Sequence, residues 1–434
     1  MSKKEKINVI TLGCSKNTVD SERLMNQIKL NNFKLTEDPG DAGTVIINTC
    51  GFIEAAKQES INTILNAVAL KEEGKIGKVI VAGCLSERYK DDLEKEISGV
   101  DAYFGTENYE GILKKLGGEL KYNLLGERVV TTPAHTAYLK ISEGCDHPCS
   151  FCAIPLMRGT HKSKSIESLI EETKFLAKNG AKEIIIIAQD TTDYGKDIYG
   201  RPSLSILLKK LSEVDGVEWL RLMYAYPSHF PDEVINIIAY NPKICNYVDI
   251  PLQHISDNVL KSMRRGVTAK RTRELLLNLR ERIPDITLRT TFIVGYPNET
   301  EKDFNELCEF VKEIKFDRIG VFTFSVEENT SSFILGDPVS EKEKQRRKNI
   351  LMEIQKEISM ENNKSFLGKK LKVLVEGIEG DFYVARSYRD APDVDGEILI
   401  PADEGKNALG KFHTIEVFDY NEYDLFGRFV NSEK

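Results

Sequence analysis

Residues 141–159 read ISEGCDHPCSFCAIPLMRG and place Cys145, Cys149 and Cys152 in the spacing C-x3-C-x2-C. This spacing offers three soft thiolates to a metal and no fourth. Structural zinc sites usually close their tetrahedron with four protein ligands, and a fully ligated cubane iron–sulfur cluster takes four thiolates. A cluster held by three cysteines keeps one iron open for another ligand, so the sequence predicts a catalytic [4Fe-4S] cluster here.

Zinc is the alternative occupant of these three thiolates. A zinc ion would need a fourth protein ligand, which His147 or His161 would have to supply. The residues on both sides of the three cysteines also fit an iron–sulfur loop, so we favour the cluster and keep zinc as the alternative.

The first hundred residues alternate short β-branched runs with helical stretches, which is typical of a doubly wound parallel sheet. Strands are expected at 7–12, 44–48 and 78–82, and helices at 20–31, 53–72 and 87–97. Cys14, Cys50 and Cys84 each lie just beyond the carboxyl end of an expected strand. Ligands collect at that edge of an open α/β sheet. We therefore expect these three thiolates to converge on a second cluster.

An alternative is that these three cysteines are ordinary buried small hydrophobes, since free cysteine is among the most buried residue types. Their equivalent positions after three strands, each beside a loop glycine, favour the metal site instead. Cys245 and Cys308 lack that context, and we assign them no role.

A second α/β series follows a glycine-rich connector at about 116–135. Its strands are expected at 138–142, 183–189, 218–224, 247–251, 287–294 and 318–324. Six βα units predict a partial (β/α)6 barrel, in which chemistry collects at the carboxyl ends of the strands. Gln189, Asp190 and Gly295 lie at such ends and are our candidates for binding a nucleoside cofactor. His254 lies at another strand end, and we interpret it as structural.

The pattern changes again from residue 366 onward. Five short strands are expected at 370–376, 382–387, 397–401, 413–419 and 424–430. So many short strands with tight turns predict a small closed β-barrel of the oligonucleotide-binding type. Residues 366–434 contain 9 Lys and Arg against 14 Asp and Glu, a net charge of 9 − 14 = −5. This charge argues against a surface that tracks a nucleic-acid backbone.

The composition of the whole chain predicts a cytoplasmic protein with no membrane span. Its apolar runs are far shorter than a bilayer requires, and the N-terminus leads directly into an expected strand. Eight cysteines in a chain of 434 residues fit reduced metal ligands better than a disulfide framework. The net charge of −8 argues against indiscriminate binding to a nucleic-acid backbone.

The motif C-x3-C-x-aromatic-C, with Phe151 as the aromatic, resembles the signature of radical S-adenosylmethionine (AdoMet) enzymes, and residues 141–159 resemble their methylthiotransferase branch. The resemblance implies that the open iron of the Cys145, Cys149 and Cys152 cluster chelates AdoMet and generates a 5′-deoxyadenosyl radical. It also implies an auxiliary 4Fe-4S cluster on the N-terminal cysteines and AdoMet contacts along 291–297. Two 4Fe-4S clusters and S-adenosyl-L-methionine are thus the expected cofactors.

Residues 385–396, ARSYRDAPDVDG, resemble the RimO branch of this family rather than the tRNA-modifying MiaB branch. That resemblance implies methylthiolation of the β-carbon of an aspartyl residue in small-subunit ribosomal protein 12. An acidic terminal barrel suits a basic ribosomal partner. An electron donor of the flavodoxin or ferredoxin type is also implied.

The resemblance divides the chain into three domains. We expect an N-terminal methylthiotransferase domain at 1–118, a radical AdoMet domain at 131–364 and a TRAM domain at 366–434. Three alternatives remain open: a tRNA adenosine methylthiotransferase, a non-catalytic iron–sulfur RNA module, and a zinc-binding module.

Overall fold

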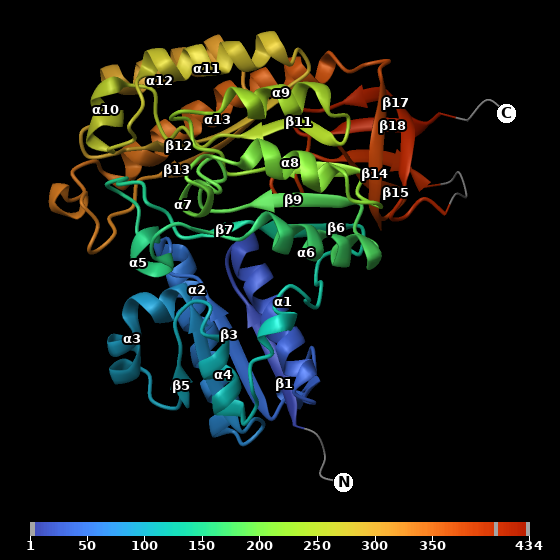
Figure 1. Ribbon diagram of the computed structural model, residues 1–434. Helices are drawn as coiled ribbons and strands as arrows, with labels where there is room; N and C mark the ends of the chain where they lie inside the picture. Colours follow the sequence, from blue (N-terminus) through green and yellow to red (C-terminus); the bar gives the residue numbers. More distant parts are fainter. Residues whose placement is uncertain (1–4, 403–406, 431–434) are drawn as a thin grey trace.

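The computed structural model describes residues 5–402 and 407–430. Two parallel sheets and a closed β-barrel follow one another along the chain (Figure 1). The N-terminal sheet lies below the central one in this view, and the β-barrel lies to its right. The predicted fold class is confirmed.

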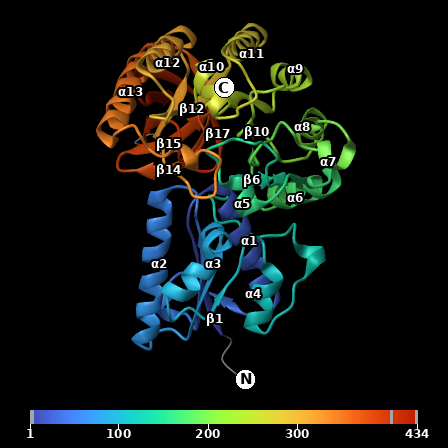
Figure 2. The ribbon, with the colours of Figure 1, turned by 90° about the vertical axis from the view of Figure 1, so that its left-hand side faces the viewer.

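The N-terminal sheet has five parallel strands in the order β2-β1-β3-β4-β5. Its strands are β1 (Lys6–Thr11), β2 (Lys34–Leu35), β3 (Thr44–Thr49), β4 (Lys78–Gly83) and β5 (Ala102–Tyr103). Its helices are α1 (Ser15–Leu30), α2 (Glu54–Glu72), α3 (Cys84–Glu96) and α4 (Tyr109–Leu116). Apolar residues of α1 and α4 pack on one face of the sheet, and those of α2 and α3 on the other (Figure 2). Every residue of β3 is buried because helices cover both of its faces.

The central sheet has six parallel strands in the order β13-β12-β11-β10-β9-β6. The sheet is open, as predicted for a partial barrel. These strands are β6 (Thr136–Lys140), β9 (Glu183–Ile187), β10 (Trp219–Leu222), β11 (Ile244–Asp249), β12 (Thr287–Val294) and β13 (Arg318–Thr323). The larger helices that cover them are α6 (Ile166–Lys178), α8 (Leu204–Ser212), α9 (Asp232–Tyr240), α11 (Ala269–Arg282), α12 (Glu301–Ile314) and α13 (Glu341–Lys364). A large apolar core fills the space between the strands and these helices.

Shorter elements complete this part of the chain. They are β7 (Ser142–Glu143), which pairs with β8 (Lys162–Ser163), and the helices α5 (Ile154–Arg158), α7 (Lys196–Tyr199) and α10 (Asp257–Ser262). Helix α5 lies above the N-terminal sheet, between the two sheets (Figure 1).

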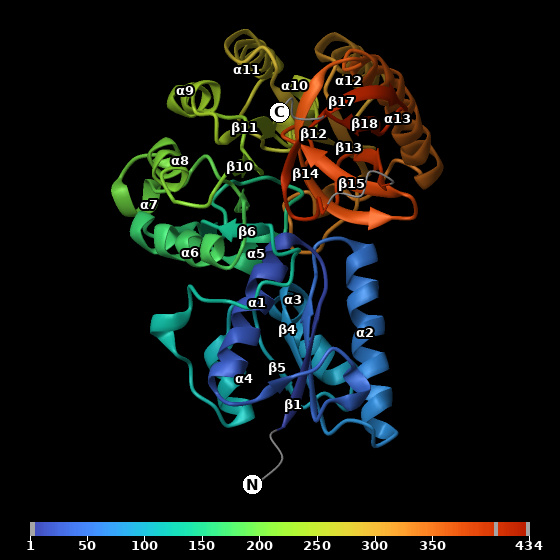
Figure 3. The same ribbon diagram turned by 90° about the vertical axis from the view of Figure 1, so that its right-hand side faces the viewer.

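The terminal barrel closes in the order β14-β15-β16-β18-β17. Its strands are β14 (Lys370–Glu379), β15 (Phe382–Ser387), β16 (Ile398–Pro401), β17 (Phe412–Tyr420) and β18 (Leu425–Phe429). It packs against the amino ends of the central strands, where Arg386 forms a buried ion pair with Glu183 at the start of β9 (2.6 Å). The carboxyl ends of the central strands point away from it (Figures 1 and 3).

Sequence analysis did not predict β2, β5 or α4. The two strands contain two residues each, too few for any periodicity to be visible. Within the described part of the chain, no helix is long and apolar enough to cross a bilayer.

Candidate functional site

All six cysteines of the two predicted trios line one cavity of about 480 Å³. Cys145, Cys149 and Cys152 enter it from the loop that follows β7. Cys14, Cys50 and Cys84 enter it from the carboxyl ends of β1, β3 and β4. The cavity therefore lies where the carboxyl edge of the N-terminal sheet meets the mouth of the central one.

The 145–152 loop is held by backbone hydrogen bonds to the residues that end α5 and α10. The Cys145 N–H donates to the carbonyl of Gly159 (3.1 Å), and the Ser150 N–H donates to that of Met263 (3.0 Å). Gly144 has a φ of +75°, and a Cβ there would lie 2.1 Å from the Thr160 carbonyl oxygen. Only glycine fits this approach, which explains the residue before the first cysteine of the motif.

Arg265 places a positive charge beside this trio. Its Nη1 donates to Cys149 Sγ (3.4 Å), and its Nη2 donates to the carbonyl of Pro251 (2.6 Å). The guanidinium also lies 4.2 Å from the ring centroid of Tyr226, whose hydroxyl donates to the Arg265 carbonyl (2.6 Å). A fixed cation beside a sulfur stabilises the thiolate that metal ligation requires.

Asn17 connects the loops of the other trio. Its Nδ2 donates to the carbonyls of Leu12 (2.7 Å) and Thr49 (3.1 Å). These residues shortly precede Cys14 and Cys50 in the sequence. Its Oδ1 lies 3.8 Å from Cys84 Sγ. One fully buried amide thus fixes three loops that the sequence separates widely.

The glycines beside these cysteines mark further close approaches between loops. Gly13 has a φ of +89°, and a Cβ there would lie 2.8 Å from Cys50 Cβ. Gly83 has a φ of +97°, and a Cβ there would lie 2.6 Å from the Thr49 carbonyl oxygen. Larger residues would force the three loops apart.

Arg158 links the two trios. It follows the first trio in sequence, and its Nε donates to Cys84 Sγ of the second trio (3.3 Å). Its Nη1 pairs with Asp20 (2.7 Å) and Glu143 (3.1 Å), and its Nη2 donates to Asn17 Oδ1. Burial alone would raise the pKa of Asp20, but Lys140 and Arg158 hold it well below its ordinary value. The network is therefore ionised, and it joins α1 to the central domain.

The buried thiols of the two trios are weak acids without a metal. Burial raises the pKa of Cys145 and Cys152 to about 12 and that of Cys84 to about 11. A metal must displace these protons when it binds. Two sets of three cysteines that line one cavity, each with an arginine donating to one sulfur, fit two iron–sulfur clusters.

The other predicted cofactor residues lie at different depths. Phe151 and Gln189 line the cavity, and the Gln189 amide donates to Glu143 (2.7 Å). Asp190 lies behind the cavity wall, where it bonds to Thr192 and to His147 (2.6 Å). Gly295 also lies outside the lining, and its N–H donates to Glu299.

The histidines of the zinc alternative already contact other side chains. His147 stacks on Tyr226, with ring centroids 3.6 Å apart, and His161 lies 3.0 Å from the Ser163 hydroxyl. The groups of potential ligand atoms within 4.8 Å of one another, among the described residues, are His147/Asp190/Asp193 and Asp20/Glu107/Glu143. Neither group contains a cysteine, so the tetrahedral zinc site lacks support.

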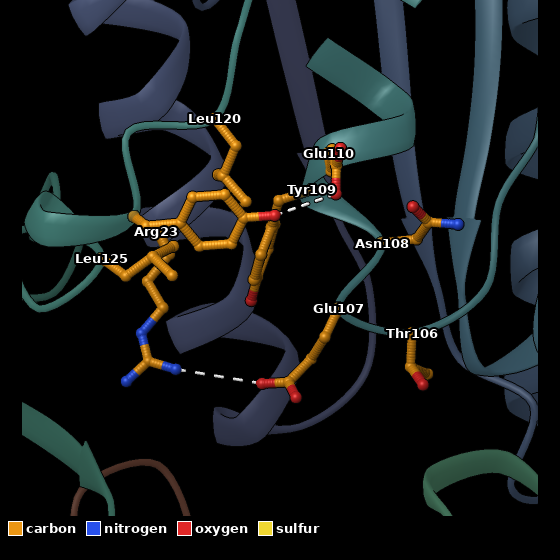
Figure 4. A pocket seen from close by; sticks show the side chains of 9 residues that line it. Arg23, Thr106, Glu107, Asn108, Tyr109, Glu110, Leu120 and Leu125 are labelled. Carbon is orange, nitrogen blue, oxygen red and sulfur yellow. Dashed lines mark hydrogen bonds and ion pairs between the residues drawn. The ribbon is translucent and has the colours of Figure 1, made fainter. Parts of the chain in front are cut away.

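A second cavity, of about 540 Å³, lies between α1, α4 and the connector (Figure 4). Arg23 and Glu107 face each other across it (3.9 Å), and the Tyr122 hydroxyl donates to Glu110 (2.9 Å). No cysteine is among its lining residues. It therefore offers no thiolates to a metal, and the cysteine cavity is the candidate active site.

Sequence analysis missed Asn17, Arg158 and Arg265 as site residues. Arg158 lies inside the quoted 141–159 stretch, and Asn17 lies three residues after Cys14. Their nearness to cysteines was the available signal. Arg265 lies in no motif that we recognised, and only the fold brings it to Cys149.

Known proteins resemble this chain along its whole length. Residues 6–105 match uncharacterized protein family UPF0004, residues 139–311 match the radical SAM superfamily, and residues 367–430 match the TRAM domain. A Flavobacterium johnsoniae protein named ribosomal protein uS12 methylthiotransferase RimO is 52% identical over 428 residues, 98% of each chain. Relatives of the same name from Cytophaga hutchinsonii and Chloroherpeton thalassium are 49% and 50% identical, over 99% of each chain. This chain belongs to the RimO family.

Membership of the RimO family confirms the predicted enzyme class, a radical AdoMet methylthiotransferase, and the predicted cofactors, AdoMet and [4Fe-4S] clusters. Among solved structures, the radical S-adenosylmethionine methyltransferase TsrM from Kitasatospora setae, with cobalamin and a [4Fe-4S] cluster bound, has a TM-score of 0.57. It is 13% identical, and the match covers 76% of this chain and 77% of that one. This likeness shows the fold alone.

Proposed function

We propose that this RimO-family enzyme adds a methylthio group to the β-carbon of an aspartyl residue in ribosomal protein uS12, the protein named by its relatives. The observation that carries the proposal is the single cavity shared by both cysteine trios. A carbon that is activated at one trio and receives sulfur at the other must reach both without leaving the site.

Within this proposal, Cys145, Cys149 and Cys152 hold the cluster that binds AdoMet, and Cys14, Cys50 and Cys84 hold the auxiliary one. When bound, the first cluster supplies the electron that cleaves AdoMet reductively. The chain itself supplies orientation and charge. Arg265 and Arg158 each donate to one cysteine sulfur, and the apolar walls contributed by Phe151, Met157 and Ile154 limit the entry of water.

Gln189, Asp190 and Gly295 are proposed to act on AdoMet from different positions. Gln189 lines the cavity and offers an Oε1 atom that is buried without a partner among the described residues. Asp190 orients His147, which does line the cavity. Gly295, beyond the lining, shapes the turn after β12: a Cβ there would lie 2.3 Å from the Lys344 side chain.

The domain limits 1–118, 131–364 and 366–434, the cytoplasmic location, and an electron donor of the flavodoxin or ferredoxin type remain part of the proposal. Docking of uS12 by the TRAM domain is also part of the proposal, because the net charge of −5 of this domain suits a basic partner. Part of that acidity is internal, however, because Asp390 and Asp395 are buried against arginines of the central domain. The exposed acidic surface is therefore smaller than the sequence suggested.

The test supplies the reconstituted, reduced holoenzyme with AdoMet and either purified uS12 or tRNA. We expect mass spectrometry to find the methylthio group on an aspartate of uS12 and none on tRNA. Methylthiolated adenosine would instead support the MiaB-like alternative. Zinc in place of iron, or iron for fewer than two clusters, would contradict the assignment of both trios.

A further inference from the structure

Lys16 is a buried lysine that faces the cysteine cavity with no anionic partner among the described residues. It is the second residue of α1, and its side chain lines the same cavity as both trios. Only 7% of its surface is exposed. No carboxylate, carbonyl or hydroxyl among the described residues accepts a hydrogen bond from its ammonium group, which lies 2.9 Å from the centroid of the Tyr224 ring.

The other cations of this cavity are engaged. Arg158 pairs with Asp20 and Glu143, and Arg265 donates to Pro251 and Cys149. The lining contains no Asp or Glu. The ammonium group of Lys16 is therefore a positive charge that faces this cavity with no carboxylate in the lining, and it can bind an anion that enters the cavity.

The surroundings of Lys16 fix the aromatic ring beneath its ammonium group and add further positive charge. Tyr224, beneath the ammonium group, has a φ of +59°, a conformation that non-glycine residues adopt rarely. Its N–H donates to Asp249 (3.1 Å), and its carbonyl accepts from the Thr191 N–H (3.1 Å). The N-terminus of α1, with no acidic residue in its first turn, adds the positive end of a helix dipole.

We propose that Lys16 binds the side-chain carboxylate of the aspartyl residue that the enzyme modifies. The inference rests on the proposed function, and it identifies what distinguishes the substrate within that cavity. In aspartate the β-carbon is bonded directly to the carboxyl carbon. An ammonium group that fixes the carboxylate therefore fixes the reacting carbon as well, and it selects against an uncharged nucleobase.

The position of Lys16 favours the substrate carboxylate over that of AdoMet. Lys16 comes two residues after Cys14, the N-cap of α1. It therefore lies beside the trio that is proposed to deliver sulfur. The cation beside the AdoMet-binding trio is Arg265 instead. The two carboxylates share their chemistry, and the experiment below separates them.

The test uses the reconstituted holoenzyme with AdoMet and without reductant, so that binding is measured without turnover. Its variants are Lys16→Met and, as a matched control, Lys29→Met, an exposed lysine of the same helix. The ligands are uS12 and uS12 with asparagine in place of the modified aspartate. Lys16→Met loses a buried charge-assisted hydrogen bond to the substrate. We therefore expect it to bind uS12 about 10- to 100-fold more weakly than the wild type. Lys29→Met should bind uS12 like the wild type.

The asparagine form of uS12 sharpens the test. It should bind Lys16→Met and the wild type equally, since the charge that Lys16 recognises is gone, and Lys16→Arg should restore much of the affinity for the aspartate form. Equal binding of the aspartate form by Lys16→Met and the wild type would overturn the inference.

Two further outcomes would also overturn it. They are a selective loss of AdoMet affinity in Lys16→Met, and a loss of iron in that variant, which would assign the ammonium group to AdoMet or to a cluster. If the wild type transfers no methylthio group to uS12, the proposed function fails and the inference fails with it. If the wild type does transfer it and Lys16→Met binds normally, only the inference fails.

Discussion

The two cysteine trios line one cavity but are held by different means. Cys145, Cys149 and Cys152 lie on one loop, which is fixed by backbone hydrogen bonds to Gly159 and Met263. Cys14, Cys50 and Cys84 come from three separate strand ends. Their loops are connected by one amide, Asn17, and by Arg158, which comes from the other domain. The first trio is a local structure, whereas the second depends on how two domains pack.

This difference gives the two sites different sensitivities. The loop of the first trio is held by its neighbours in the central domain. The second trio receives an N–H···S bond from Arg158, a residue of the first trio's own segment. The second site is therefore complete only when the N-terminal domain is docked, and docking places both sites in one cavity.

The largest expected effect comes from the local trio. Cys149→Ala removes the thiol that Arg265 contacts and leaves two cysteines, too few to hold an open cluster. We expect reductive cleavage of AdoMet to be abolished and the iron content to fall by about half, since one of two equal clusters is lost. Liquid chromatography of 5′-deoxyadenosine and an iron assay measure both.

Cys308→Ala is the matched control, because Cys308 packs in α12 with the central core. It should keep both the iron and the activity. Persistent AdoMet cleavage in Cys149→Ala would remove the radical cluster from this loop.

Sequence analysis named all three cysteines of the local trio, and the structure places them in one cavity. The C-x3-C-x2-C spacing lies within a few residues, so its chemistry is visible without a fold. The second trio was predicted by one additional physical rule, that the carboxyl ends of parallel strands share an edge. The six long strands of the central sheet and the five strands of the terminal barrel were also predicted, since their hydrophobic patterns extend over four or more residues.

What the sequence could not give is the set of contacts between distant segments. Arg265 reaches Cys149 only because the loop after α10 folds over the cluster loop. Lys16 meets the ring of Tyr224 only because the fold brings the start of α1 to the end of β10. Neither a hydrophobic period nor a motif encodes such pairs, and the same limit applies to the buried network around Arg158.

Arg158→Met tests whether the dispersed trio depends on domain docking. The substitution leaves the buried carboxylates of Asp20 and Glu143 without one of their cations. Breaking a buried ion pair in this way typically costs about 3–5 kcal/mol of folding free energy. We expect a lower urea midpoint by circular dichroism, together with faster loss of iron to a chelator.

Arg346→Met, on the exposed side of α13, is the control, because its pairs with Glu301 and Glu343 are at the surface. It should change both measurements little. Unchanged stability and iron retention in Arg158→Met would show that the second trio does not need the central domain.

The smallest effect is expected within the N-terminal domain itself. Asn17→Ala removes the side-chain donor to the half-buried carbonyl of Leu12 and the buried carbonyl of Thr49, a change that typically costs about 1–3 kcal/mol. Asn26→Ala, which removes a bond to the Glu127 carbonyl from a half-buried position of the same helix, should cost less. Urea unfolding compares the stability of the two variants, and chelator challenge reports on the clusters.

If Asn17 fixes the three loops, its variant should lose the iron of the dispersed trio first and keep the radical-cluster signal in electron paramagnetic resonance. Loss of both clusters at the same rate would mean that the two trios are not held independently. The local loop would then depend on the N-terminal domain as much as the dispersed trio does.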